Sequence, residues 1–248
     1  MSLQTQSLRF TEGATVLHGH LAWDDDLTGP RPGVLICPDA SGLGPEAQRR
    51  AAMLADLGYV ALAIDYYGDG LQPSGEALMQ AIAPLRADVS LLRRRALAGL
   101  AQLQAQPLVD GARLAAIGYC FGGTMALELA RADAALRGVV SFHGGLTPAR
   151  EDELARMRAA VLLLTGADDP MVPLEAVARF GEEMRRTPVD WQVQVYGGAR
   201  HAFTRPDVHL RSPGNPALGY HEAADRRSWQ AMRSFFDELF EAEHALQD

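Results

Sequence analysis

The stretch Gly118-Tyr119-Cys120-Phe121-Gly122-Gly123 limits what this chain can fold into more than any other. The apolar run 113–117 before it predicts a buried strand, and residues 124–130 after it predict a helix. A Gly-x-Cys-x-Gly turn between a strand and a helix is typical of a nucleophile elbow, whose central side chain stands exposed on a strained turn. Backbone N–H groups at a helix N-terminus favour a thiolate or an oxyanion. The alternative is that Cys120 is a buried structural cysteine in a glycine-rich loop.

Apolar runs elsewhere alternate with helical patterns. Continuous apolar or alternating runs predict strands at 33–38, 59–64, 138–142, 159–165 and 191–196, and an edge strand at 14–23. Helices are expected from Pro45 to just before Gly58, at 74–83, after Asp88 and at about 220–243. This order predicts one α/β domain over residues 1–248, with a mostly parallel sheet and helices on both faces.

Composition excludes several classes of protein. The 248 residues carry a formal net charge of −8, which disfavours binding to nucleic acid or to anionic membranes. The sequence contains no run of 18 apolar residues, so no membrane span is expected. Its N-terminus lacks the pattern of a signal peptide. The only cysteines are Cys37, expected in the core, and Cys120, so we expect a reducing cytoplasm. His18 and His20 are too few for a metal site, and neither a metal nor a cofactor is expected.

Chemistry-bearing residues follow the predicted strands. In parallel sheets, ligands bind at the carboxyl ends of the strands. Cys120 follows one strand, Asp168 and Asp169 follow another, and His201 follows a third, in the order nucleophile, acid, histidine of an α/β-hydrolase. The spacing Gly-x-x-Asp-x-x-Val favours Asp169 as the acid, with Asp168 as a turn residue. A Cys120-His201-Asp169 triad is therefore the predicted active site.

At these residues the chain resembles the dienelactone hydrolase family of α/β-hydrolases. The resemblance depends on the elbow 118–123, on Asp169-x-x-Val172-Pro173 and on His201-Ala202-Phe203-x-Arg205. A cysteine where most elbows have serine is the most specific of these features. The resemblance implies hydrolysis of a small ester or lactone, such as an enol-lactone from aromatic-ring breakdown, through an acyl-enzyme on Cys120.

The resemblance also implies the rest of the site. The oxyanion hole would be formed by the backbone N–H of Phe121 and by one near Ala40. Asp39 matches an acidic residue, usually glutamate in the family, that holds the resting thiol. Arg205 matches an arginine that holds the substrate carboxylate. A second substrate arginine has no clear match in residues 76–80.

Loops are expected to enclose the substrate. The connection from His143 to Arg158 is too short for a separate lid domain, and the segment Thr204–Tyr220 is the best candidate for a roof. Several aromatic residues follow predicted strand ends and either line the pocket or serve only in packing: Tyr66, Tyr67, His143 and Phe203.

Other functions remain open at this point. The Arg93-Arg94-Arg95 run is expected to be mostly solvated helix face. The alternatives to a lactone hydrolase are a thioesterase or general carboxylesterase and a non-catalytic scaffold that binds a ligand or partner. A thiol redox protein is disfavoured because no second cysteine lies near Cys120 in the sequence. We expect a small-molecule substrate and a monomer or small homo-oligomer.

Overall fold

A computed structural model describes residues 2–241 of the chain. Its sheet has eight strands in the order β1-β2-β4-β3-β5-β6-β7-β8. The bounds are β1 Leu3–Glu12, β2 Thr15–Asp24, β3 Arg31–Cys37, β4 Val60–Ile64, β5 Val109–Tyr119, β6 Gly138–Phe142, β7 Ala160–Gly166 and β8 Trp191–Tyr196. β1 and β2 pair antiparallel, as do β2 and β4, and the other neighbours are parallel. The predicted mostly parallel α/β sheet is confirmed.

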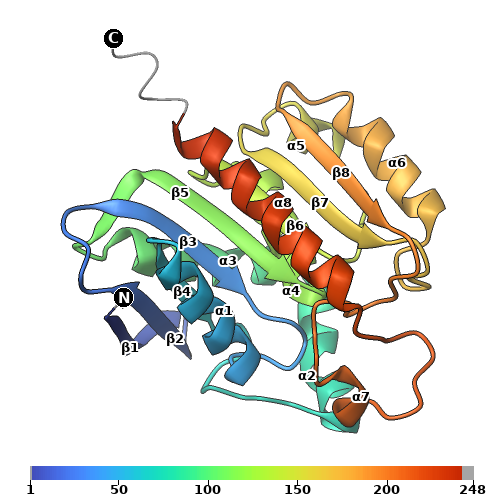
Figure 1. Ribbon diagram of the computed structural model, residues 1–248, viewed down its shortest axis with the longest axis horizontal. Coiled ribbons are helices and arrows are strands. Elements are labelled where there is room, and N and C mark those ends of the chain that lie inside the picture. Colours follow the sequence, from blue (N-terminus) through green and yellow to red (C-terminus); the bar gives the residue numbers. More distant parts are fainter. Residues whose placement is uncertain (1, 242–248) are drawn as a thin grey trace.

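Helices cover both faces of this sheet (Figure 1). Their bounds are α1 Pro45–Asp56, α2 Gly75–Ala87, α3 Val89–Gln104, α4 Phe121–Arg131, α5 Glu151–Leu154, α6 Leu174–Met184, α7 Val208–Arg211 and α8 Glu222–Glu241. One apolar core lies under α1 and α8, and the other lies under α3, α4 and α6. Strands β3 to β7 contribute side chains to both cores, because a parallel strand alternates its residues between two buried faces.

The predicted helices are present with some changes at their ends. Asp88 caps α3, because its carboxylate accepts hydrogen bonds from the N–H groups of Ser90 and Leu91. The helix predicted at 74–83 continues to Ala87 as α2, although Pro84 lies inside it. The last predicted helix begins at Glu222 and is described to Glu241; its predicted residues 242–243 lie outside the described residues.

The prediction of an edge strand at 14–23 is wrong about its place in the sheet. β2 lies between β1 and β4, and β1 forms the edge. Residues 3–12 escaped prediction because most of their side chains are exposed and polar, so the stretch has no clear apolar alternation. Cys37 is fully buried in β3, as predicted.

Candidate active site

The elbow at Cys120 is strained as its sequence requires. Cys120 caps the N-terminus of α4 with φ 53° and ψ −117°, a backbone conformation that a residue with a Cβ rarely adopts. A Cβ on Gly118 would lie 1.9 Å from the carbonyl oxygen of Gly122, and one on Gly122 would lie 2.0 Å from that of Cys37. Both glycines are therefore needed for the strand, the turn and α4 to approach one another, and the Cys120 side chain is left at the carboxyl end of β5.

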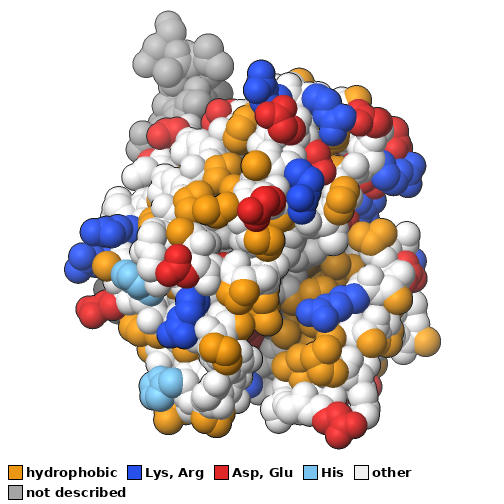
Figure 2. Space-filling view, turned by 90° about the vertical axis from the view of Figure 1, so that its right-hand side faces the viewer, with side chains coloured by type: hydrophobic (Ala, Val, Ile, Leu, Met, Phe, Trp, Pro, Cys, Tyr) orange, Lys and Arg blue, Asp and Glu red, His pale blue; other side chains and the backbone are white. Residues whose placement is uncertain are grey.

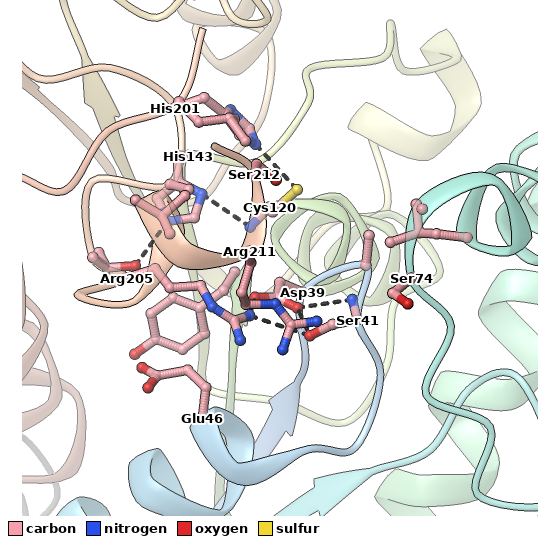
Figure 3. Close-up of a pocket in the computed structure, with 18 residues that line it drawn as sticks. Asp39, Ser41, Glu46, Ser74, Cys120, His143, His201, Arg205, Arg211 and Ser212 are labelled. Carbon is pink, nitrogen blue, oxygen red and sulfur yellow. Dashed lines mark hydrogen bonds and ion pairs between the residues drawn. The ribbon is translucent and has the colours of Figure 1, made fainter. Parts of the chain in front are cut away.

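Three side chains from three different loops meet at this elbow, and Figure 3 shows two of them, Cys120 and His201, in contact. His201 Nε2 lies 3.1 Å from Cys120 Sγ, and His201 Nδ1 lies 2.8 Å from Asp169 Oδ2. The second carboxylate oxygen of Asp169 accepts hydrogen bonds from the N–H groups of Met171 and Val172. Asp168 is exposed, whereas Asp169 is 2% exposed. The structure thus brings together a thiol, an imidazole and a buried carboxylate in hydrogen-bonding sequence.

The charges in this cluster favour a protonated His201. Burial by itself lowers the pKa of His201, but the Cys120 thiolate and the Asp169 carboxylate raise it to about 10. A protonated imidazole beside the sulfur would stabilise a thiolate, which is the form of cysteine that acts as a nucleophile.

His143 is a second imidazole at this site, and it contacts the backbone of the elbow. Its Nδ1 accepts a hydrogen bond from the Cys120 N–H at 3.1 Å, and its Nε2 lies 2.8 Å from Thr204 Oγ1. Burial lowers the pKa of His143 well below its ordinary value, and the nearby charge of His201 acts in the same direction. The ring is therefore neutral, with its proton on Nε2 and donated to Thr204. The predicted alternatives were lining or packing; His143 lines the cavity and also holds the strained backbone of Cys120.

The candidate oxyanion hole joins two elements. Phe121 is the first residue of α4, so its N–H is among those for which a helix offers no acceptor. Ala40 lies in the loop after β3 and lines the same cavity as Cys120. The Tyr66 hydroxyl donates to the carbonyl oxygen of Asp39, and the Tyr67 hydroxyl donates to that of Ala40 at 2.8 Å. Tyr67 therefore positions the loop, although the sequence suggested it for the substrate pocket.

Tyr66 acts on the peptide unit that carries the Ala40 N–H. The carbonyl of Asp39 and the N–H of Ala40 belong to one trans peptide, so they point in opposite directions. A hydroxyl bound to the carbonyl fixes the direction of the N–H and polarises it. Tyr66 is fully buried, and burial raises its pKa well above the ordinary value, so the hydroxyl stays protonated.

We expect Tyr66→Phe to lower kcat for ester hydrolysis by about 10-fold, with little change in KM. The reason is that the Ala40 N–H loses the partner that orients it, while Cys120 and His201 keep their geometry. The rate of Cys120 alkylation by iodoacetamide should stay the same, because alkylation forms no oxyanion. Tyr196→Phe is the control, since its hydroxyl binds Gln194. A parallel fall in alkylation would contradict this role for Tyr66.

Three other predicted site residues, Asp39, Arg205 and Phe203, contact protein groups. The Asp39 carboxylate accepts hydrogen bonds from Arg205 and from the backbone and hydroxyl of Ser41. Arg205 is 7% exposed, and its Nε donates to Asp207 at 2.8 Å. Phe203 is fully buried and packs edge-on against His143. The sequence did not predict the Asp39–Arg205 ion pair, because 166 residues separate its partners.

Two cavities meet at Cys120 and His201. The first, about 170 Å³, is lined in part by residues of the 204–220 segment, which was the predicted roof: Thr204, Arg205, Val208, Arg211, Ser212 and Leu218. The second, about 570 Å³, has a mainly apolar part formed by Leu85, Val89, Leu92, Phe121, Pro148, Met171 and Val172. Figure 2 shows a face of the molecule on which hydrophobic side chains gather around a recess. An ester whose carbonyl carbon lies at the Cys120 thiol therefore has one cavity for its acyl part and another for its alcohol part.

The expectation that the 93–95 run is mostly solvated is wrong. Arg94 is exposed, but Arg93 binds Glu128 and Glu153, and Arg95 donates to the carbonyl oxygens of Tyr66 and Tyr67. Arg93 thus lines the larger cavity, and Arg95 binds the backbone of Tyr66 and Tyr67, whose hydroxyls hold the loop after β3. The helical pattern of α3 alone could not show this, because both partners lie on other elements.

Among residues 2–241, no helix is both long and apolar enough to cross a membrane.

Comparison with known proteins agrees with the fold and the motifs. The sequence model of the dienelactone hydrolase family matches residues 17–240. A Bradyrhizobium protein named as a probable 2-oxo-3-(5-oxofuran-2-ylidene)propanoate lactonase is 30% identical over 202 residues, which are 77% of this chain and 79% of that protein.

Solved structures agree as well. A dienelactone hydrolase-like promiscuous phosphotriesterase from metagenomic libraries superposes with a TM-score of 0.93 at 44% identity, over 96% of this chain and 99% of that one. A dienelactone hydrolase from Anabaena variabilis superposes with a TM-score of 0.67 at 21% identity, over 94% and 99% of the two chains, which supports the fold. The chain belongs to the dienelactone hydrolase family and has its α/β-hydrolase fold.

Proposed function

We propose that this hydrolase cleaves small carboxylic esters or lactones through an acyl-enzyme on Cys120. The observation that carries the proposal is the chain of contacts at the elbow: 3.1 Å from Cys120 Sγ to His201 Nε2, and 2.8 Å from His201 Nδ1 to Asp169. A thiol, a base and a residue that orients the base are the parts that nucleophilic acyl transfer needs.

The first half of the reaction forms a thioester. The Cys120 thiolate attacks the carbonyl carbon, a C–S bond forms, and the π electrons move to the carbonyl oxygen. The N–H groups of Phe121 and Ala40 stabilise that oxyanion, a contribution of about 3–4 kcal/mol per donor in related sites. The intermediate then expels the alcohol oxygen, which takes its proton from the His201 imidazolium.

The second half restores the enzyme. Neutral His201 takes a proton from a water molecule as that water attacks the thioester carbonyl. The second oxyanion collapses, the C–S bond breaks, and the acid leaves. The released thiolate again faces protonated His201. Thiolates are good leaving groups, so activated esters, lactones and thioesters suit this site better than amides.

The alternatives differ in substrate or in activity. A thioesterase or general carboxylesterase would use the same residues with another substrate, and the lactonase named among the relatives supports the lactone assignment. A non-catalytic scaffold is disfavoured because it has no need for a cysteine at φ 53° or for a buried carboxylate behind the histidine. We also propose a reducing cytoplasmic location, in which Cys120 stays reduced, and a monomer or small homo-oligomer.

A second candidate activity is the cleavage of phosphotriesters. The neighbour at 44% identity is named a promiscuous phosphotriesterase. The cavity of about 570 Å³ beside Cys120 has room for an aryl group, and thiolate attack on phosphorus with loss of a phenolate needs the same oxyanion donors. This activity would be secondary to acyl transfer.

The acyl-enzyme provides the direct test. We expect brief incubation with p-nitrophenyl acetate, acid quenching and peptide mass mapping to show one acetyl group on the peptide that contains Cys120. The peptide that contains Cys37 should stay unmodified, because Cys37 is fully buried. Diethyl p-nitrophenyl phosphate in the same assay tests the second activity. Acetylation of another residue, with Cys120 unmodified during turnover, would contradict the mechanism.

A further inference from the structure

The smaller cavity is lined by several hydroxyl groups, and they differ in whether their hydrogens can be donated to a substrate. The Ser41 hydroxyl donates to the Asp39 carboxylate. Ser74 is exposed and Ser212 is half-buried, so water competes for their hydrogens. Thr204 is 3% exposed, and a hydrogen bond made in such a place is stronger than one made in water. The contacts of Thr204 therefore decide what its hydroxyl can do.

His143 fixes the role of the Thr204 hydroxyl oxygen. A backbone N–H can only donate, so the contact of 3.1 Å between the Cys120 N–H and His143 Nδ1 makes that nitrogen an acceptor (Figure 3). Burial holds the pKa of His143 well below its ordinary value, so the neutral ring carries its single ring hydrogen on Nε2. Thr204 Oγ1 lies 2.8 Å from Nε2 and is therefore the acceptor of that hydrogen.

The hydrogen of the Thr204 hydroxyl is left for another partner. A hydroxyl donates one hydrogen and accepts through its lone pairs, and here a lone pair faces His143. In the part of the chain that the structure describes, no group lies in position to accept the Thr204 hydrogen. A buried donor without an acceptor is unfavourable. Because Thr204 lines the smaller cavity, an acceptor atom of a substrate can take this hydrogen there.

Thr204 is also held in place by its backbone. Its carbonyl oxygen accepts a hydrogen bond from Arg50 Nη2 at 2.7 Å, and the same nitrogen donates to Asp225 at 2.9 Å. Arg50 is 2% exposed and belongs to α1, whereas Asp225 belongs to α8. Thr204 is thus tied to two helices through Arg50 and to the elbow through His143. A donor fixed in this way loses little conformational freedom when it binds a ligand.

The position of Thr204 decides which substrate atom it can meet. Nδ1 and Nε2 point away from each other on the His143 ring, so the ring separates the Thr204 hydroxyl from the backbone of Cys120. In the proposed mechanism, the carbonyl oxygen under attack faces the Phe121 and Ala40 N–H groups. An acceptor at Thr204 is therefore a second oxygen, carried by the part of the substrate that enters the smaller cavity.

We propose that the Thr204 hydroxyl donates a hydrogen bond to the substrate, and that His143 is the positioning residue that orients this hydroxyl. The ligand class is an ester or lactone with an ether, carbonyl or hydroxyl oxygen near the scissile bond, on the part that enters the smaller cavity. The mainly apolar part of the larger cavity receives the rest of the substrate. The inference rests on the proposed hydrolase function.

Matched esters test the donor on both sides of the scissile bond. Two pairs vary the acyl part: p-nitrophenyl methoxyacetate with p-nitrophenyl butyrate, and p-nitrophenyl 3-methoxypropanoate with p-nitrophenyl pentanoate. A third pair varies the alcohol: 2-methoxyethyl benzoate with butyl benzoate. In each pair an ether oxygen replaces one methylene, and the measured quantity is the ratio of kcat/KM for the ether to kcat/KM for the alkyl ester. Comparing variants on the same pair removes the difference in chemical reactivity between its members.

Thr204→Val keeps the shape of the side chain and removes its hydroxyl. We expect this variant to lower the ratio about 5-fold or more for at least one pair, because the ether oxygen loses its partner in the cavity. Thr204→Ser keeps a hydroxyl and should retain the native ratios. Thr187→Val is the control, because the Thr187 hydroxyl donates to the carbonyl oxygen of Met184 and lines neither cavity. Ratios that Thr204→Val leaves unchanged in all three pairs would refute the proposal.

His143→Phe tests the positioning role. Phenylalanine fills the space of the ring but offers no hydrogen to the Thr204 oxygen, so the hydroxyl can turn away from the substrate, and the ratio should fall about 3-fold. Any disturbance of the elbow in this variant lowers kcat/KM for both members of a pair and leaves their ratio unchanged. Native ratios in His143→Phe would show that His143 does not orient the hydroxyl.

Failure of this inference is distinguishable from failure of the proposed function. If Cys120→Ala retains the hydrolysis of every ester, the function assigned to the site is wrong, whatever the ratios are. If hydrolysis requires Cys120 but Thr204→Val keeps every native ratio, only the role given to Thr204 is wrong.

Discussion

Cys120→Ala is expected to lower kcat for p-nitrophenyl acetate by about 10⁴-fold or more. Loss of a nucleophile of this kind removes the covalent route, and only binding and the oxyanion donors remain. The overall fold should persist, because Cys120 is half-buried at a turn and alanine is smaller. Steady-state release of p-nitrophenolate, corrected for spontaneous hydrolysis, measures the effect, and circular dichroism checks the fold.

Cys37→Ala is the matched control for this substitution. It removes the other thiol of the chain, from the core of β3, without touching the elbow side chain. Burial raises the pKa of Cys37, so this thiol is inert, and the variant should keep its kcat even if its stability falls. Activity that survives in Cys120→Ala but disappears in Cys37→Ala would exchange the roles assigned to the two cysteines.

Asp169→Asn is expected to lower kcat by about 10⁴-fold, as loss of the orienting carboxylate does in other triads. The amide cannot stabilise the imidazolium, and it allows the wrong tautomer of His201. Asp168→Asn, at the exposed neighbouring position, should keep the native kcat. A native kcat in Asp169→Asn would show that this carboxylate does not orient His201.

The pH profile gives an independent measure of the same contact. The pKa of His201 is raised to about 10, so the native imidazolium persists through neutral pH and is lost as the pH rises through that value. Hydrolysis of an ester with a poor leaving group, such as ethyl butyrate, should therefore decline only near pH 10, because the alcohol takes its proton from His201. In Asp169→Asn the missing negative charge lowers the His201 pKa, so the decline should begin at a lower pH. A decline at the same pH in both enzymes would contradict the contribution of Asp169 to the His201 pKa, and a decline of the native enzyme near neutral pH would contradict the raised pKa itself.

Apolar patterns along short stretches predicted most of the fold, because they show which residues of a strand or helix are buried. Continuous apolar runs identified β3, β4, β6 and β7, whose residues are buried on both faces. β1 was missed because an exposed edge strand needs no apolar alternation. Its pairing with β2 provides the backbone hydrogen bonds that define it, and such pairing is not written in the sequence of either strand alone.

The candidate triad was predictable for a related reason. Two glycines at fixed offsets report a backbone that tolerates no Cβ, and the carboxyl ends of parallel strands share one edge of the sheet. The choice of Asp169 over Asp168 also depended on local spacing. The position of each residue along its strand therefore brought Cys120, Asp169 and His201 to one place before any contact was known.

The sequence by itself determined the α/β-hydrolase sheet, the strained elbow at Cys120 and the three side chains around it, because these follow from residue spacing along single elements. The tertiary structure alone decided how the charges are distributed around that site. Asp39 occupies Arg205, Glu128 and Glu153 occupy Arg93, and neutral His143 holds the Cys120 N–H. Each of these contacts joins residues from separate loops or helices, and the strength of a charge depends on its partner and its burial, which only the folded chain sets.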